Sequence, residues 1–133
     1  MDLLGTYDVS VDTKFSIQEI ESNVCGKQHD RFRDECILAK NNYIKLYVLV
    51  ENDDEVKSID DLKKWDNPRL HTQKWVTTPG GERRKVLKYP KATSGETLAK
   101  ALNTMQERYG VIFKFCSPEE AGAMVLELLG VEV

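Results

Sequence analysis

The sequence of 133 residues lacks any apolar run long enough to cross a membrane, because a spanning helix needs about 20 mainly apolar residues. It also lacks a basic leader followed by an apolar stretch after Met1, so we expect no secretion signal. Both absences favour a cytoplasmic protein without a membrane partner. Hydrophobic residues make up 41% of the chain and charged residues 31%, which favours a folded globular protein over disorder.

Cysteine and histidine are also scarce. The three cysteines, Cys25, Cys36 and Cys116, are widely spaced, and an odd number argues against a disulfide framework and fits a reducing compartment. Of the two histidines, His29 forms a loose pair with Cys25, but a zinc site needs a second pair of ligands nearby. We therefore expect free thiols and no zinc site.

The net charge of −3 conceals an uneven distribution. Residues 69–91 contain seven basic residues against the single acid Glu82, a local balance of +6, so the remainder of the chain carries −9. A basic segment on an otherwise acidic protein is typical of a polyanion-binding surface, and an ordinary solvated loop is the alternative. The length suits one domain, residues 1–133, in which residues 66–93 form a basic insertion.

The first half of the chain alternates between strand and helix patterns. Residues 7–14 predict a strand, a short helix begins near Ser16, and a second helix ends at Asn41 and Asn42. YIKLYVLVEN then has the near-continuous apolar character of a central strand that is buried on both faces. SIDDLKKW predicts a short helix capped by Ser58 and closed by Pro68.

The second half continues this alternation. WVTT and KVLKY predict the arms of a hairpin around a Pro-Gly-Gly turn, and SGETLAKALNTMQERYG predicts a long helix stopped by Gly110. VIFKFC is a strand, and SPEEAGAMVLELLG is a helix whose start is marked by Ser117 and Glu120 as a capping box. Strands separated by helices predict an α/β fold, a sheet flanked by helices.

Asp12 and Lys14 raise a chemical question. Two residues apart on a strand, their side chains project to the same face. Carboxylates that hold a divalent cation, with a lysine beside them, suit metal-dependent phosphodiester cleavage. By itself an Asp-x-Lys pair more often means a surface ion pair.

The surrounding sequence resembles the XPF-type nuclease domain of the PD-(D/E)XK, or restriction-endonuclease-like, superfamily. Val11-Asp12-Thr13-Lys14 stands at the family's Val-Glu-Arg-Lys, and Asp2 lies ten residues earlier, where the family has the aspartate of Gly-Asp. HDRFRDE is similar to the start of a family helix, YVLVEN to its buried strand, and FCSPEEAGAMVLELL to its last strand and helix. The resemblance implies a restriction-endonuclease-like mixed sheet flanked by helices, lacking the family's first strand.

The resemblance also implies roles for individual residues. Asp2 and Asp12 would ligate Mg²⁺ or Mn²⁺, and Lys14 would face the scissile phosphate and the attacking water. Arg31 would support the substrate, and Glu19 would supply a further catalytic acid, one residue beyond the family's spacing. Glu51 is a weaker candidate. The expected nucleic-acid contacts are Arg31, Lys74, Arg83, Arg84, Lys85, Lys88 and Lys91.

Three functions remain open at this point. The first is a metal-dependent DNA endonuclease, structure-specific or nicking. The second is a catalytically inactive, nuclease-like phage or mobile-element protein that binds and inhibits a host nucleic-acid-targeting defence complex. The third is a nuclease-like subunit that pairs with an active partner. We also expect self-association as a homodimer, with helix 118–129 presenting an apolar stripe of Met124, Val125, Leu128 and Leu129.

Overall fold

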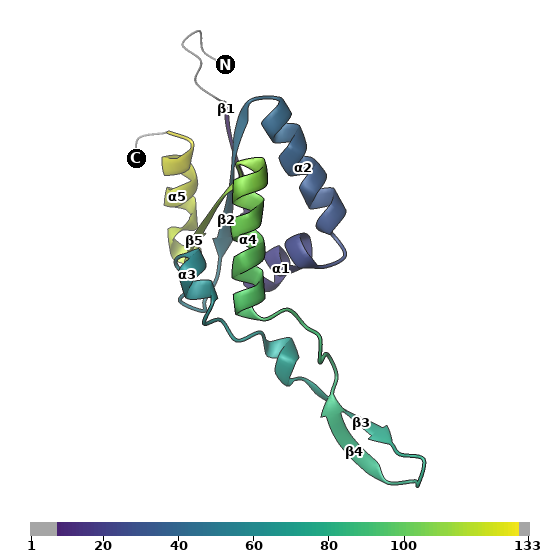
Figure 1. The fold of residues 1–133 in the computed structure, drawn as a ribbon. Coiled ribbons are helices and arrows are strands. Elements are labelled where there is room, and N and C mark those ends of the chain that lie inside the picture. Colours follow the sequence, from purple (N-terminus) through teal and green to yellow (C-terminus); the bar gives the residue numbers. More distant parts are fainter. Residues whose placement is uncertain (1–7, 131–133) are drawn as a thin grey trace.

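A three-stranded sheet with helices on both faces forms the body of the molecule, and a long hairpin extends from it (Figure 1). The computed structural model describes residues 8–130. The described elements are, in chain order, β1 (Asp8–Lys14), α1 (Ile17–Cys25), α2 (His29–Asn41), β2 (Ile44–Glu51), α3 (Ile59–Leu62), the 3₁₀ turn η1 (Pro68–His71), β3 (Gln73–Thr77), β4 (Arg83–Leu87), α4 (Gly95–Tyr109), β5 (Ile112–Cys116), the 3₁₀ turn η2 (Pro118–Glu120) and α5 (Ala121–Leu128).

The sheet of the body has the strand order β1-β2-β5, and all of its pairings are parallel. Parallel neighbours need a crossover connection, which α1 and α2 supply between β1 and β2, and α4 supplies before β5. The predicted α/β class is confirmed, and β2 is the central strand, as its apolar sequence indicates. The antiparallel pair β3-β4 forms a separate sheet.

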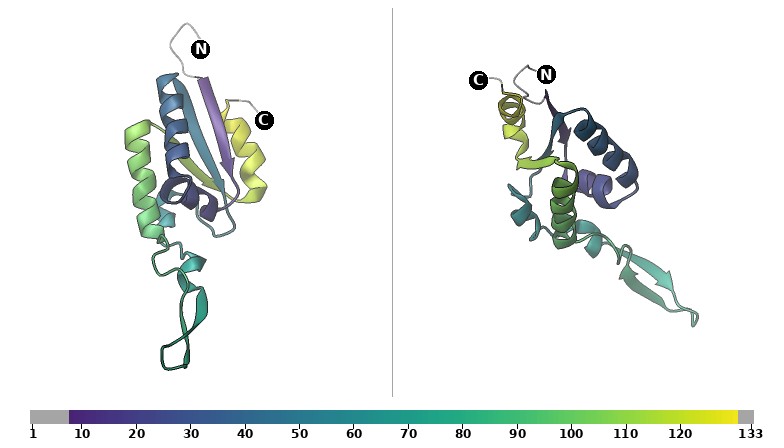
Figure 2. Two further views of the ribbon diagram at one scale, coloured as in Figure 1. Left: turned by 90° about the vertical axis from the view of Figure 1, so that its right-hand side faces the viewer. Right: turned by 45° about the horizontal axis from the view of Figure 1, so that its top comes forward.

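Helices cover the two faces of the body unequally. The helices α1, α2 and α4 lie on one face, and α5 lies on the other (Figure 2). The larger core packs Ile20 and Leu102 of these helices against Val48 and Val50 of β2. On the opposite face Leu49, Cys116 and Ala121 form a smaller cluster with Val11, Met124 and Val125 packed against it. The alternation of β2 therefore divides its valines and leucine between two layers.

Helix boundaries follow the capping residues that the sequence contains. Ser16 and Ser94 accept hydrogen bonds from the backbone N–H groups three residues on, at the starts of α1 and α4. Gly110 ends α4 with a φ of 71°, a left-handed conformation that glycine adopts without strain. Ser117 and Glu120 form the predicted capping box, although the first turn that it caps is 3₁₀.

The helix predicted within SIDDLKKW is shorter than expected. Ser58 caps it as predicted, but α3 ends at Leu62 rather than at Pro68, and Pro68 instead begins η1. The chain turns away because buried Asn67 is anchored elsewhere: its side-chain amide donates to the carbonyl oxygen of Thr93 at 2.7 Å. Tertiary contacts thus override the local helix pattern.

The thiols provide a test of this packing. Cys36 and Cys116 are buried and Cys25 is exposed, and burial is the main cause that raises the pKa of Cys36 to about 12. Because the thiolate is the reactive form, we expect one thiol per native chain to react with a disulfide reagent, and all three only after unfolding. Cys25→Ser should remove the native reaction. If all three thiols of the native protein reacted with the reagent at the same rate, this packing would be contradicted.

Candidate functional site

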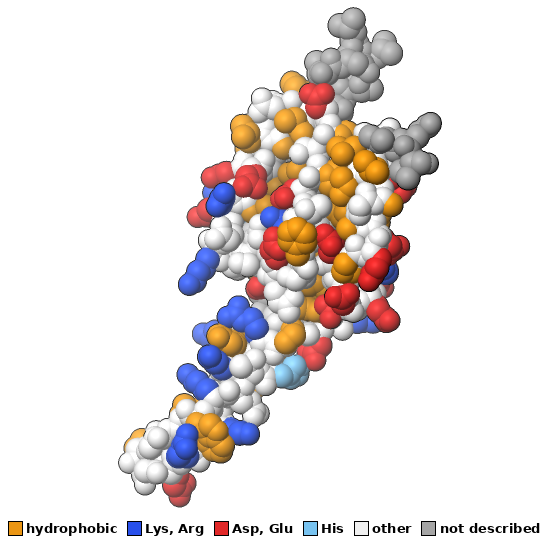
Figure 3. Space-filling model, turned by 180° about the vertical axis from the view of Figure 1, so that it is seen from behind, with side chains coloured by type: hydrophobic (Ala, Val, Ile, Leu, Met, Phe, Trp, Pro, Cys, Tyr) orange, Lys and Arg blue, Asp and Glu red, His pale blue; other side chains and the backbone are white. Residues whose placement is uncertain are grey.

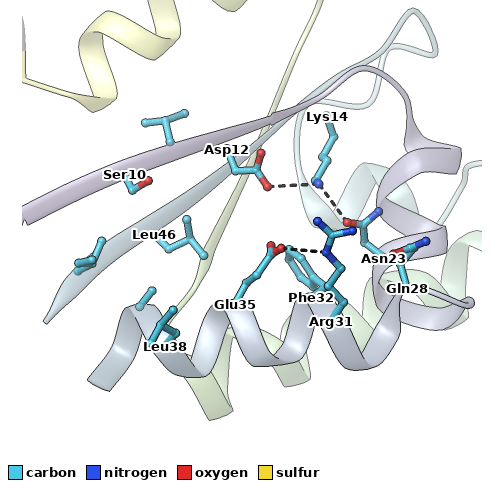
Figure 4. A pocket seen from close by; sticks show the side chains of 13 residues that line it. Ser10, Asp12, Lys14, Asn23, Gln28, Arg31, Phe32, Glu35, Leu38 and Leu46 are labelled. Atoms are coloured by element: carbon cyan, nitrogen blue, oxygen red, sulfur yellow. Dashed lines mark hydrogen bonds and ion pairs between the residues drawn. The ribbon is translucent and has the colours of Figure 1, made fainter. Parts of the chain in front are cut away.

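The site begins at the carboxyl end of β1, where Asp12 and Lys14 meet as predicted. Because side chains alternate along a strand, both turn toward α2, whereas Val11 packs against the cluster beneath α5. The Lys14 Nζ lies 3.2 Å from the Asp12 Oδ2 (Figure 4). The Asp12 side chain is 41% exposed and that of Lys14 only 12%, so solvent reaches the carboxylate more freely than the ammonium group.

Lys14 is held from three directions. In addition to Asp12, its ammonium group donates to the Asn23 Oδ1 at 3.0 Å, and it lies 5.8 Å from the centroid of the buried Phe32 ring. Asn23 is fixed in turn, because its amide nitrogen donates to the Glu19 carbonyl at 2.6 Å. The lysine is therefore pre-positioned by a strand neighbour, by α1 and by α2.

An open cleft of about 630 Å³ runs between β1 and α2. Its polar end contains Asp12, Lys14, Asn23, Gln28, Arg31 and Glu35, and its other end is apolar, with Leu38 and Leu46 (Figure 4). Two cations, Lys14 and Arg31, lie at the polar end, each paired with a carboxylate. A phosphate that displaced one of these carboxylates would find a charged donor in its place.

Arg31 lies at this polar end, as predicted. It extends from the first turns of α2, and its Nε lies 3.6 Å from the Glu35 Oε1, one helical turn further on. The Arg31 side chain is 79% exposed, so this surface ion pair holds it weakly. Arg31 is thus free to exchange Glu35 for an anionic ligand.

Three residues of the polar end were missed by the sequence interpretation: Asn23, Gln28 and Glu35. Asn23 had a usable signal, since Ser16, Glu19 and Asn23 share one face of a helix that starts directly after Lys14. Gln28 and Glu35 depend on how α2 folds back over β1, for which the sequence has no local signal.

Two other predicted acids, Glu19 and Glu51, are not among the described residues that line the cleft. The Glu19 carboxylate accepts the Phe15 backbone N–H at 3.0 Å, and its own N–H donates to the Ser16 hydroxyl, so it completes the cap of α1. Glu51 ends β2 opposite Cys116 in β5, away from the residues that line the cleft. Asp2 lies outside the described residues.

The metal implied by the resemblance can be tested against the donors present. Within residues 8–130 there is no group of three or more His, Cys, Asp or Glu side chains able to hold an ion. Asp12 fits as one oxygen ligand at the mouth of the cleft, but Lys14 already engages its carboxylate. The described residues alone do not form a metal site.

The predicted basic residues, apart from Arg31, lie together on or beside the hairpin. We call residues 69–91 the arm; Lys and Arg side chains gather along it, whereas acidic side chains are concentrated on the body (Figure 3). All seven basic residues of the arm are exposed: Arg69, Lys74, Arg83, Arg84, Lys85, Lys88 and Lys91. The arm extends from the end of the body to which the parallel strands point (Figure 2), which is also the end where β1 carries Lys14.

The root of the arm lies beside α1. The Arg69 guanidinium lies 4.2 Å from the centroid of the Tyr89 ring, and both residues line a groove with Glu21 and Cys25 of α1. The side of α1 that carries Glu21 and Cys25 therefore lines this groove, whereas Asn23 of the same helix contacts Lys14 in the cleft.

The apolar stripe expected on the last helix is partly used within the chain. Met124 and Val125 pack against the cluster on β2 and β5, whereas the more exposed leucines are Leu126 at 40% and Leu129 at 43%. Of the predicted stripe, Leu129 is thus the most exposed member, and self-association through α5 remains a prediction.

No protein-family model matches this chain, and no curated protein and no solved structure matches it significantly. The XPF-type resemblance therefore stays a prediction from the sequence. Among the described residues, no helix is long and apolar enough to span a membrane.

Proposed function

We propose that the protein is a metal-dependent DNA endonuclease of XPF type, structure-specific or nicking. The observation that supports this most directly is the Asp12–Lys14–Asn23 group at the end of a parallel strand, at the polar end of an open cleft. In open α/β sheets, ligands bind outside the carboxyl ends of the strands. The basic arm at the same end of the body suits DNA as the ligand.

In this proposal the cleft residues contact the scissile phosphate and the arm binds the rest of the DNA. Lys14 donates to a phosphate oxygen or to the attacking water, and Asn23 keeps its ammonium group in place. Arg31, released from Glu35, adds a second donor to the phosphate. The arm holds the backbone of the DNA without reading its sequence.

The cofactor in this proposal is Mg²⁺ or Mn²⁺. Asp12 would be one ligand, and Asp2, outside the described residues, would be the other. Residues 8–130 contain no group of three or more His, Cys, Asp or Glu side chains that could complete the site. Whether cleavage needs the metal is therefore measured directly.

The test is cleavage by the purified full chain. Supercoiled plasmid, a fork and a flap are incubated with Mg²⁺, with Mn²⁺ and with a chelator. We expect nicking of the plasmid or cutting near the branch with either metal, and none with the chelator. If none of the three substrates is cut with either ion, the nuclease proposal fails.

A second candidate is a catalytically inactive, nuclease-like phage or mobile-element protein that binds and inhibits a host nucleic-acid-targeting defence complex. The observation in its favour is that Asp12 is paired with Lys14 and that the described residues form no metal group. It predicts that the three substrates stay uncut with either metal, and that the purified chain inhibits such a complex when added to it.

A further inference from the structure

The arm presents an exposed tryptophan between cations on one of its faces. Cross-strand partners project to the same side of an antiparallel pair, and Trp75 faces Lys85 while Thr77 faces Arg83. The guanidinium of Arg83 lies 5.1 Å, and the ammonium of Lys85 5.3 Å, from the centroid of the Trp75 ring. One aromatic surface and two cations thus form a compact patch.

Trp75 has no role in the core of the body. It is 55% exposed and belongs to neither core cluster, in contrast to Trp65, which is 8% exposed within the larger cluster. The arm is a two-stranded hairpin that extends away from the helices (Figures 1 and 2), and such a hairpin has little stability of its own. The cross-strand contacts with Arg83 and Lys85 leave more than half of the Trp75 side chain exposed and open to a ligand.

The charge of the arm identifies the class of partner. Its cations outnumber its single acid on a chain that is otherwise acidic, which favours a polyanion over a protein surface of mixed charge. The phosphates of duplex DNA would pair with the cations, but its bases are already stacked on one another and could not stack on Trp75. Single-stranded DNA can contact both, since its unpaired bases stack on aromatic rings while the cations contact its phosphates.

We propose that the Trp75 patch binds an unpaired base, so that the arm holds the single-stranded segment of a branched DNA. Arg83 and Lys85 contact the phosphates on either side, and Trp75 stacks on the base between them. Lys74 and Arg84 lie on the opposite face of the hairpin and add charge without stacking. This inference rests on the proposed function, because it names the form of DNA that the cleft receives.

Binding in chelator tests the inference without requiring cleavage. The full chain is titrated into a fluorescent forked duplex with single-stranded ends and into a blunt duplex of equal length. We expect tighter binding to the fork. Trp75→Ala should weaken fork binding by about 5-fold to 100-fold, the effect of losing one stacked base, and should leave the dependence on salt unchanged.

Two further variants separate stacking from charge. Trp75→Phe keeps an aromatic ring and should retain most of the fork affinity. Arg84→Ala, on the opposite face, should weaken fork and blunt duplex alike and lower the salt slope by roughly one unit. A triple Arg83, Arg84 and Lys85 alanine variant should lower that slope further.

Intrinsic fluorescence reports the stacking directly. A thymine oligonucleotide should quench the wild-type emission, because Trp75 is exposed, and should leave the emission of Trp75→Phe, which comes from buried Trp65, nearly unchanged. Equal affinity of wild type and Trp75→Ala for the fork, or absence of DNA binding, would overturn the inference. Binding through Trp75 without cleavage would instead remove the nuclease proposal and keep only the single-strand binding by the arm.

Discussion

Replacing Lys14 by methionine is expected to slow DNA cleavage by about 100-fold to 1,000-fold, the range found when one charged or polar donor to a transition state is removed. Methionine keeps an unbranched stem that can still pack against Phe32, but it removes the ammonium group that Asp12 and Asn23 hold in place. The loss should appear in kcat with little change in KM, because the arm still binds the DNA.

The same substitution elsewhere gives a matched control. Lys45 is exposed on β2 and lies 5.2 Å from the Tyr47 ring centroid, but it does not line the cleft. Lys45→Met should therefore cleave at the wild-type rate. Both variants should bind a fork equally well in chelator. Wild-type cleavage by Lys14→Met would remove Lys14 from the site.

Two companion variants locate the contribution of each neighbour. Asp12→Asn removes the carboxylate but keeps its shape, and should lose cleavage as completely as Lys14→Met if Asp12 holds the metal. Asn23→Ala should have a smaller effect on kcat, since it frees the lysine without removing it. Asp12→Asn breaks one partly exposed ion pair and should cost about 1 kcal/mol of stability or less. Asn23→Ala breaks two partly buried hydrogen bonds and should cost about 1–3 kcal/mol.

The order of the elements could be predicted because local signals agree with the tertiary structure. Ser16, Ser94 and Ser117 mark helix starts, Gly110 marks a helix end, and the apolar run in β2 indicates a central parallel strand. The end of α3 could not be predicted, because it depends on the contact of Asn67 with the Thr93 carbonyl, 26 residues away in sequence. A local pattern contains no information about such a partner.

The sequence predicted only part of the candidate site, again because contacts between residues far apart in the chain leave no local pattern. Asp12 and Lys14 are neighbours on one strand, so strand geometry alone brings them together. Asn23 and Arg31 reach them only after the chain has turned into α1 and α2. Glu19 lies one residue beyond the family's spacing for a catalytic acid, and the structure uses its carboxylate to cap α1, a competing role that the capping pattern Ser16-x-x-Glu19 indicates.

The largest expected effect on stability comes from a single methyl group at Gly95. This residue is buried at the start of α4, directly after the capping Ser94. A Cβ atom there would collide with the backbone carbonyl oxygens of Leu62 and Trp65, and would lie 3.2 Å from the Trp65 nitrogen. Leu62 is 0% exposed and Trp65 is 8% exposed, so the backbone that carries them cannot retreat without disturbing the core.

We therefore expect Gly95→Ala to lower the free energy of unfolding by about 2–3 kcal/mol, the upper part of the range for overpacking. Gly122→Ala is the matched control: Gly122 lies within α5, and an added Cβ would meet nothing within 4 Å. There the same change should raise the free energy of unfolding by about 0.5–1 kcal/mol, because alanine loses less backbone entropy in a helix. Urea unfolding followed by circular dichroism measures both. If the two midpoints move in the same direction, α4 does not begin against the chain that follows α3.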